Sequence, residues 1–204
     1  IKQENQVTAF IYEYMCNGSL NSYVLKNKEK ISNLFSMMTI NRIFQGIEYF
    51  HSKSLVHRDL KPSNILLDHD FIPYISDFET IRYINQNNDD EDPYETTITN
   101  GIGSFLYTAP EQDNGSLLSL SADIYSFGLI IYFLFEKNHM RYDNDLCIYA
   151  KLKDEKIPKM KQNSSNLQNL FELCIKYSPL ERPTISEIKK FIERNHNIIN
   201  KKNE

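Results

Sequence analysis

Apolar residues recur at helical spacing in several stretches of the chain. In residues 39–51 they fall three or four positions apart, which is typical of a helix with one buried face: Ile40, Ile43, Phe44, Ile47 and Phe50. Residues 167–177 and 185–193 show the same amphipathic spacing. Residues 123–135 are apolar on nearly every side, which predicts a helix buried in the centre of the domain.

Strand-like segments are shorter and lie in the first half of the chain. Residues 8–15 are apolar and aromatic-rich and predict a buried strand, and residues 74–78 predict another brief strand. Between them, Ser19 follows a turn and is expected to cap a short helix. Residues 55–68 are expected to alternate between loop and short strand. Residues 85–100 and the tail 195–204 are polar and lack periodicity, which predicts a mobile loop and a frayed end.

The stretch 57–64 (HRDLKPSN) concentrates chemically active side chains between apolar flanks. Asp59 is a candidate general base that could accept the proton of an attacking hydroxyl group. Lys61 offers a point charge for a phosphate group. Asn64 and Asp77 offer hard oxygen ligands, which Mg²⁺ prefers when it bridges nucleotide phosphates. We therefore expect Asp59, Lys61, Asn64 and Asp77 to form one polar site.

This stretch resembles the catalytic loop of eukaryotic protein kinases, in which His-Arg-Asp is followed after four residues by Asn. The resemblance implies that Asp59 and Lys61 are catalytic residues in phosphoryl transfer and that Asn64 and Asp77 hold the metal. In this family a lysine at the position of Lys61 marks serine/threonine kinases. The resemblance implies an α+β fold, namely the mostly helical C-terminal lobe with short β-hairpins around the catalytic loop, and a small N-terminal lobe that is largely missing. It divides the chain into the end of the N-lobe and the hinge (1–18), the C-lobe (19–194) and a polar tail (195–204). The chain does not begin with Met, so we expect it to be a segment of a longer protein.

Further motifs of the kinase pattern follow in order. Residues 103–111 (GSFLYTAPE) look like the end of an activation segment, in which Ser104 would hydrogen-bond near Asp59. Tyr107 would help to shape the peptide-binding surface. The resemblance implies a buried pair between Glu111 and Arg182. It also implies that Asp123 binds the backbone of the catalytic loop.

The resemblance also assigns residues around the nucleotide. Glu13 and Met15 match the hinge that pairs with adenine through its backbone, and Tyr12 would guard the back of the pocket. Leu66 would lie beneath the adenine ring. The implied substrate and cofactor are ATP and Mg²⁺. His57 is expected to play a structural part, packed against Phe78, rather than a catalytic one.

The chain departs from the family pattern at two places. The metal-binding motif reads Asp77-Phe78-Glu79, where the family has Gly last, and Glu79 is expected to stiffen a backbone hinge. The Gly-rich loop and the strand lysine of the N-lobe are absent from the sequence.

Arg58 would clamp a phosphate on the activation loop, and four residues are candidate carriers of that phosphate: Tyr94, Thr96, Thr97 and Thr99.

Composition narrows the remaining choices. The net charge of −4 argues against a basic surface for nucleic acid or anionic membranes. The partners that the resemblance implies are ATP and a protein substrate. The three cysteines are scattered, which argues against a disulfide framework or a zinc site and favours a reducing compartment, the cytosol or the nucleus. The sequence thus predicts a protein serine/threonine kinase. Alternatives are a pseudokinase or kinase-like scaffold without turnover, a small-molecule phosphotransferase, which Glu111 and Arg182 disfavour, and a tyrosine kinase, which Lys61 disfavours.

Overall fold

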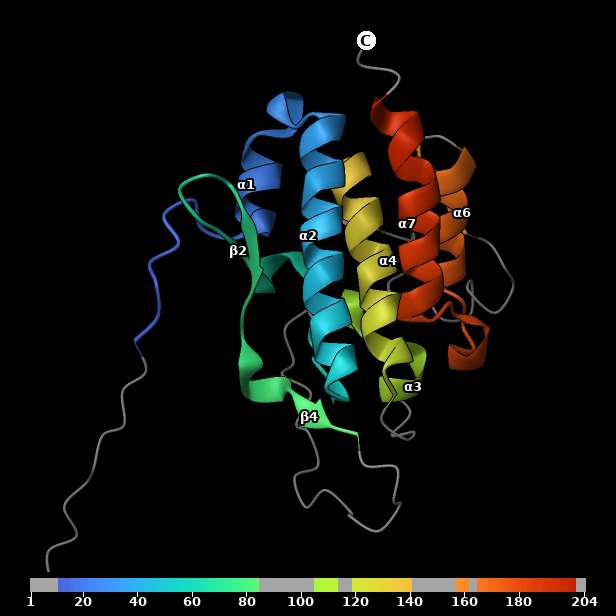
Figure 1. Ribbon diagram of the computed structural model, residues 1–204. Coiled ribbons are helices and arrows are strands. Elements are labelled where there is room, and N and C mark those ends of the chain that lie inside the picture. Colours follow the sequence, from blue (N-terminus) through green and yellow to red (C-terminus); the bar gives the residue numbers. More distant parts are fainter. Residues whose placement is uncertain (1–10, 85–104, 114–118, 141–156, 162–164, 201–204) are drawn as a thin grey trace, which may run out of the picture.

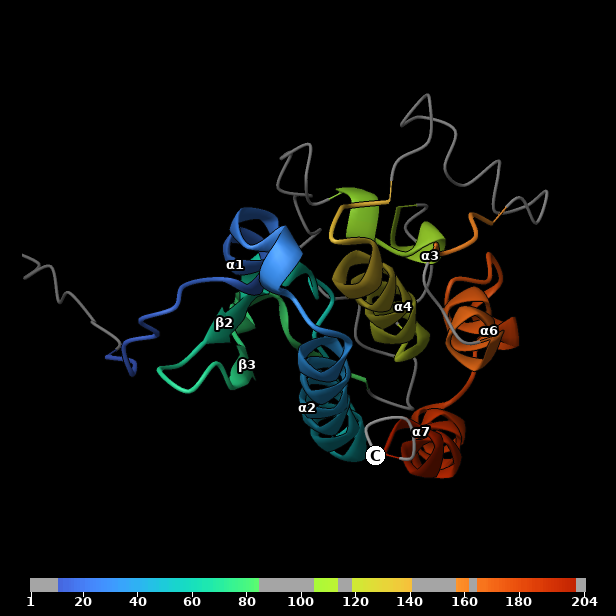
Figure 2. The ribbon, with the colours of Figure 1, turned by 90° about the horizontal axis from the view of Figure 1, so that it is seen from above.

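The computed structural model describes residues 11–84, 105–113, 119–140, 157–161 and 165–200. The long helices α2 (Asn33–Ser52), α4 (Ser121–Glu136), α6 (Ser165–Cys174) and α7 (Ile185–Asn200) stand side by side, as Figures 1 and 2 show. The short helix α1 (Leu20–Lys26) lies near the start of α2, and α3 (Pro110–Asp113) precedes α4. The predicted α+β class with a mostly helical body is confirmed.

Helix α4 forms the centre of this body. It packs against α2 on one side and α6 on the other, and α7 contacts both α2 and α6. Its apolar side chains are buried around its whole circumference, as the sequence predicted. Ser36 of α2 donates a hydrogen bond to the carbonyl of Leu134 at 3.2 Å, which joins the two helices inside the core. The burial of apolar surface on every side makes α4 the element on which the other helices are assembled.

Short strands form two antiparallel ladders next to the helices. Strand β1 (Leu55–Val56) pairs with β4 (Arg82–Tyr83), and β2 (Ile65–Leu67) pairs with β3 (Pro73–Ile75). The chain leaves β1 for residues 57–64 and enters β2, then leaves β3 for residues 76–81 and enters β4. Because each ladder fixes one end of both connecting segments, the two segments lie against each other.

Single turns of 3₁₀ helix complete the described structure: η1 (Lys28–Lys30), η2 (Pro62–Asn64), η3 (Phe78–Thr80), η4 (Phe105–Tyr107) and η6 (Pro179–Glu181). Within the described ranges, no helix has the length and apolar character required to cross a lipid bilayer.

Several boundaries differ from the sequence-based expectation. The described part of the predicted strand 8–15, residues 11–15, has no strand pairing, because no neighbouring strand lies beside it in the described structure. Strand β3 ends at Ile75, and Phe78 instead begins a 3₁₀ turn. Helix α7 continues to Asn200, so the predicted frayed tail begins in helical conformation.

Candidate active site

Four polar side chains from the two connecting segments meet between the ladders. The Asn64 amide nitrogen donates to the backbone carbonyl of Asp59 at 3.0 Å, to Asp59 Oδ2 at 3.0 Å and to Asp77 Oδ2 at 3.2 Å. Lys61 Nζ lies 2.6 Å from the same Asp59 Oδ2. The structure therefore brings together all four residues that the sequence assigned to phosphoryl transfer, although 13 positions separate Asn64 from Asp77.

A buried carboxylate holds the start of this loop from outside. Asp123, in the first turn of α4, accepts hydrogen bonds from the backbone N–H groups of His57 at 2.9 Å and Arg58 at 3.0 Å. Its Oδ2 also lies 3.2 Å from His51 Nε2, at the end of α2. Asp123 is fully buried, so these bonds are shielded from water. The predicted bonding of Asp123 to the loop backbone is present, and Asp123 also contacts His51, which was not expected from the sequence.

Two residues of the site have left-handed backbone conformations without being glycine. Arg58 has φ of 74° and Asp77 has φ of 66°. Such conformations cost free energy and persist only where surrounding contacts hold them. Glu79, by contrast, lies in the 3₁₀ turn η3, which does not require glycine. Within the motif 77–79, the strained backbone position is therefore Asp77 and not Glu79, which stands where the family has glycine.

His57 is part of an aromatic cluster behind the loop. Its ring lies 6.4 Å from the ring of Phe78 and 6.0 Å from that of Phe50, both edge-on. Its Nε2 lies 3.0 Å from the carbonyl of Ser76, so this nitrogen carries the proton and donates it. Thr80 donates to the carbonyl of His57 at 2.8 Å. These contacts fit the predicted packing role and join the catalytic loop to residues 76–80.

The predicted pair of Glu111 and Arg182 is present in the buried interior. Arg182 donates from NH1 to Glu111 Oε1 at 2.6 Å and from NH2 to Oε2 at 2.8 Å, the bidentate arrangement of a guanidinium and a carboxylate. The guanidinium also lies 5.0 Å from the centre of the Tyr125 ring. This pair fixes α3 against α4 and the segment before α7.

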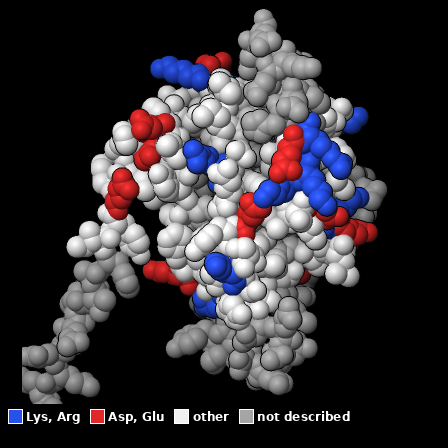
Figure 3. All heavy atoms as spheres, in the orientation of Figure 1, with Lys and Arg blue, Asp and Glu red and all other residues white. Residues whose placement is uncertain are grey.

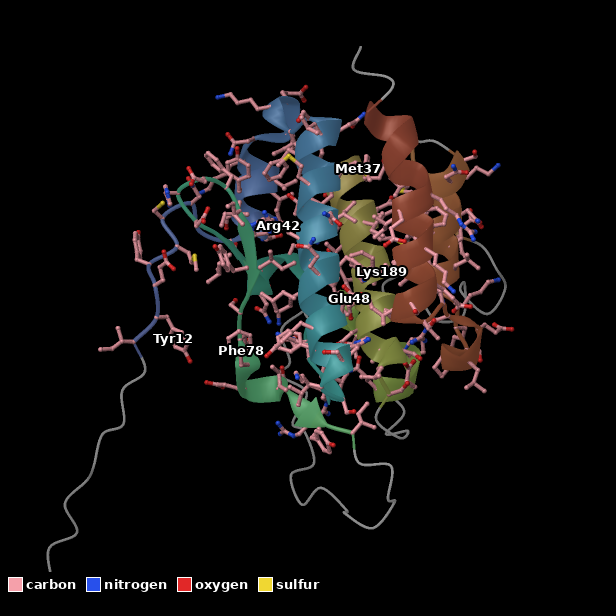
Figure 4. The ribbon with its side chains drawn as sticks, viewed as in Figure 1. Tyr12, Met37, Arg42, Glu48, Phe78 and Lys189 are labelled. Carbon is pink, nitrogen blue, oxygen red and sulfur yellow. The ribbon has the colours of Figure 1, made fainter. Side chains whose placement is uncertain are left out.

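The hinge segment contacts the site through β2. Asn17 N donates to Leu67 O at 3.2 Å, and Leu67 N donates to Gly18 O at 2.9 Å, around a bridge between Ser19 and Leu66. Leu66 and Met15 are half-buried, whereas Glu13 and Tyr12 are exposed. Figure 4 shows Tyr12 on the extended segment, away from the helices. The structure thus pairs Leu66 with Ser19 at the end of this segment, and the side chain of Glu13 is exposed to solvent.

Comparison with known proteins decides the family. The protein kinase domain matches residues 1–191. The chain belongs to the protein kinase family. It is 31% identical over 206 residues to cysteine-rich receptor-like protein kinase 46 of Arabidopsis thaliana, covering 90% of this chain and 33% of that protein. It is 30% identical over 184 residues to the RGS domain-containing serine/threonine-protein kinase A of Dictyostelium discoideum, covering 89% of this chain and 16% of that protein.

A third relative is cysteine-rich receptor-like protein kinase 6 of rice (Oryza sativa subsp. japonica). It is 31% identical over 218 residues, covering 94% of this chain and 30% of that protein. The chain therefore spans about a third or less of the length of these curated relatives.

The donor set of this kinase site is compatible with Mg²⁺. Asp77 has carboxylate oxygens, and the Asn64 amide nitrogen lies 3.2 Å from one of them. The same Asn64 amide carries an oxygen that can serve as a ligand when the amide group turns over. Mg²⁺ commonly takes one or two protein oxygen ligands and fills its remaining positions with water and phosphate. The described residues contain no group of three or more His, Cys, Asp or Glu side chains that could hold a metal without such help.

Some of the predicted site residues lie outside the described ranges. Ser104 and the candidate phosphate carriers Tyr94, Thr96, Thr97 and Thr99 belong to residues 85–104, which the structure does not describe.

Gln112 was not singled out from the sequence, yet it contacts the catalytic loop. The Ala-Pro-Glu motif locates the start of a helix, and a Gln three residues after the cap is a readable capping signal. Its second contact, with the loop, has no sequence signal.

Proposed function

We propose that this chain is the catalytic lobe of a protein serine/threonine kinase, which transfers the γ-phosphate of ATP to a protein hydroxyl group. The observation that carries the proposal is the hydrogen-bonded cluster of Asp59, Lys61, Asn64 and Asp77. Each of these residues has a distinct part in phosphoryl transfer. Their arrangement, held by Asp123 from α4, resembles a site organised for catalysis rather than a solvated loop.

In this proposal Asp59 orients the substrate hydroxyl and accepts its proton as the oxygen bonds to phosphorus. Lys61, 2.6 Å from Asp59, places a positive charge where it can stabilise the transferred phosphoryl group and the carboxylate together. Asn64 and Asp77 are the residues that would hold Mg²⁺. The metal, when bound, would neutralise negative charge on the phosphates. The phosphoryl group forms a bond to the hydroxyl oxygen as its bond to ADP breaks.

The nucleotide and the substrate bind at opposite ends of this arrangement in the proposal. Met15 and Leu66 would line the adenine side of the cleft, with Glu13 contributing backbone groups only. Tyr107 would support the peptide-binding surface from beneath, because its side chain is buried. This burial raises the pKa of its hydroxyl group far above the usual range. That hydroxyl lies 2.9 Å from His139 Nδ1 and remains protonated at physiological pH. We propose a cytosolic or nuclear location on the cysteine usage alone.

The first experiment compares the complete protein with its Asp59→Asn variant in phosphorylation of a generic protein substrate with Mg²⁺ and ATP. Removing the carboxylate should lower kcat by about 100-fold or more, since a positioned general base contributes roughly 10²- to 10⁴-fold. Asp70→Asn is the matched control, because Asp70 is an exposed aspartate whose carboxylate contacts only its neighbour His69 in the described structure. Phosphoamino-acid analysis of the product should give phosphoserine or phosphothreonine.

Two outcomes would contradict the proposal. Equal turnover by wild type and Asp59→Asn would show that Asp59 does not carry the chemistry. No phosphorylation by the wild-type protein, together with retained binding of a protein partner, would indicate a kinase-like scaffold.

A further inference from the structure

Gln112 bridges two segments that are 54 residues apart in the chain. Its side-chain oxygen accepts a hydrogen bond from the backbone N–H of Ala109 at 3.0 Å. Its side-chain amide donates to the backbone carbonyl of Arg58 at 3.0 Å. The first bond is one half of a capping box at the start of α3, because Gln112 is the third residue of that helix. The second bond leaves the helix altogether and reaches the catalytic loop.

The residue that receives this bond is strained. Arg58 has φ of 74°, a conformation that disfavours any residue with a Cβ atom. Its N–H donates to Asp123 at 3.0 Å, so side chains from α3 and α4 hold both polar backbone atoms of Arg58. The carbonyl of Arg58 belongs to the planar peptide group that begins Asp59. Fixing that carbonyl therefore fixes the plane from which the Asp59 side chain departs.

Gln112 itself is well anchored. The residue before it, Glu111, is held by both ends of the Arg182 guanidinium. Ala109, whose N–H donates a hydrogen bond to Gln112, is fully buried. The amide of Gln112 is thus presented from a helix start that has little freedom to shift, and it can define the position of the Arg58 carbonyl rather than follow it.

We propose that Gln112 is a positioning residue for Asp59: by holding the carbonyl of Arg58 it stabilises the left-handed turn that aims the candidate catalytic carboxylate. The kinetic part of this inference rests on the proposed kinase function, whereas its structural part does not. The side-chain oxygen of Gln112 caps α3, and its side-chain nitrogen positions the loop. Substitutions that keep only one of these two groups can separate their effects.

Gln112→Glu keeps an oxygen for the Ala109 N–H and replaces the donor to Arg58 with a second oxygen. Gln112→Lys does the reverse, since its ammonium group can donate to the Arg58 carbonyl but cannot accept from Ala109. In the complete protein we expect Gln112→Glu to lower kcat by about 10- to 100-fold, as small misplacements of catalytic groups do, with little change in KM for ATP. Gln112→Lys should retain most of kcat while lowering the melting temperature.

Gln168 of α6 offers a matched control. Its side chain makes a similar bridge away from the catalytic loop. Its oxygen accepts from Met160 N at 2.9 Å, and its amide donates to Pro158 O at 3.2 Å and to Glu172 Oε1 at 2.7 Å. Gln168→Glu should therefore change stability without changing kcat per folded molecule. A loss of kcat in Gln168→Glu equal to that in Gln112→Glu would overturn the proposal.

Hydrogen–deuterium exchange tests the structural part independently of activity. Gln112→Glu should speed amide exchange in peptides that cover residues 57–64 by at least severalfold, while Gln168→Glu should leave those peptides unchanged. Unchanged exchange in Gln112→Glu overturns the proposal, and so does unchanged kcat in an active protein. An inactive wild-type protein in which Gln112→Glu still loosens the loop would count against the kinase function but would support the positioning role.

Discussion

The Arg182 side chain donates hydrogen bonds to one carboxylate and three backbone carbonyls. Besides both Glu111 oxygens, its guanidinium donates to the carbonyls of Lys176 at 2.8 Å, Ser121 at 3.0 Å and Tyr177 at 3.1 Å. These five bonds use all five N–H groups of the side chain. A lysine could not reproduce this planar fork.

We expect Arg182→Met to lower the free energy of unfolding by about 3–5 kcal/mol, because it leaves the Glu111 carboxylate buried without its cation. Arg182→Lys should fall between wild type and Arg182→Met. The double variant Glu111→Leu with Arg182→Met should recover part of the loss, since no buried charge remains. Urea denaturation measures all of these changes. A cost below about 0.5 kcal/mol for Arg182→Met would show that the pair contributes little.

At the residue scale, the sequence predicted which side chains meet but not how the backbone presents them. The kinase-like motifs that contain Asp59, Lys61, Asn64 and Asp77 were sufficient to predict that these side chains meet in one site. The left-handed conformations of Arg58 and Asp77 could not be predicted, because neither residue is Gly or Asn and the strain is stabilised by distant groups. The loop contact of Gln112 was missed for the same reason.

The contact between α4 and α6 depends on a glycine. A Cβ atom on Gly128 would lie 2.7 Å from Cys174 Cβ and 2.9 Å from Ile175 Cγ2, and Cys174 Cβ cannot move without its backbone. Gly46 of α2 is the matched case, since its Cβ would meet the end of the Ile75 side chain at 2.7 Å. That end is free to rotate.

We therefore expect Gly128→Ala to destabilise the protein by about 1–3 kcal/mol, as overpacking of a core does. Gly46→Ala should stay within about 1 kcal/mol of wild type, because the helix propensity gained offsets the shift of Ile75. Thermal or urea unfolding of the two variants tests this. Equal costs for both would contradict the importance of close packing between α4 and α6.

Helix α7 begins with a capping box that titrates. Glu187 accepts from Thr184 N at 2.8 Å and from the Thr184 hydroxyl group at 2.9 Å, and these bonds lower the pKa of Glu187. Because the folded-state pKa lies below the unfolded-state pKa, the stabilisation is complete above the unfolded value and is lost as pH falls through the folded value. The melting temperature of wild type should exceed that of Glu187→Ala at neutral pH. The difference should shrink in acid, and a constant difference would contradict this linkage.

At the element scale, periodicity predicted where helices occur better than it predicted where they begin and end. The 39–51 pattern identified α2, but the helix begins at Asn33 because the Ser32 hydroxyl accepts from Phe35 N at 3.1 Å. The capping signal of Thr184 and Glu187 was present in the sequence and was overlooked. The strand predicted at 8–15 failed for a different reason. Its composition favours a strand, but a strand also needs a neighbouring strand to pair with.

Charged side chains of opposite sign lie next to one another on the face of the molecule that holds α2 and α7. Figure 3 shows basic side chains gathered on the right of this face, with acidic side chains beside them. One such pair joins the two helices, with Lys189 Nζ 2.8 Å from Glu48 Oε1, and Figure 4 shows the two side chains facing each other. The pair is exposed, so it contributes little to stability.

The cysteines provide a test of the molecule's cooperativity. Burial raises the pKa of the Cys174 thiol, which lies between α4 and α6, whereas Cys16 is exposed. At about pH 8 iodoacetamide should alkylate Cys16 in the native protein and spare Cys174, since the thiolate is the reactive form. Cys174 should react only when the protein unfolds in urea. Peptide mapping by mass spectrometry distinguishes the sites, and native labelling of Cys174 at the rate of Cys16 would contradict a closed core.

The bonds that shape the catalytic loop have a consequence for protein engineering. Residues 57–64 carry most of the candidate chemistry, but Asp123, Gln112, Ser76 and Thr80 hold the loop from elsewhere in the chain. Grafting the loop alone into another scaffold would transfer its functional groups without their geometry. The smallest transplantable unit would have to include the starts of α3 and α4 and the segment between β3 and β4.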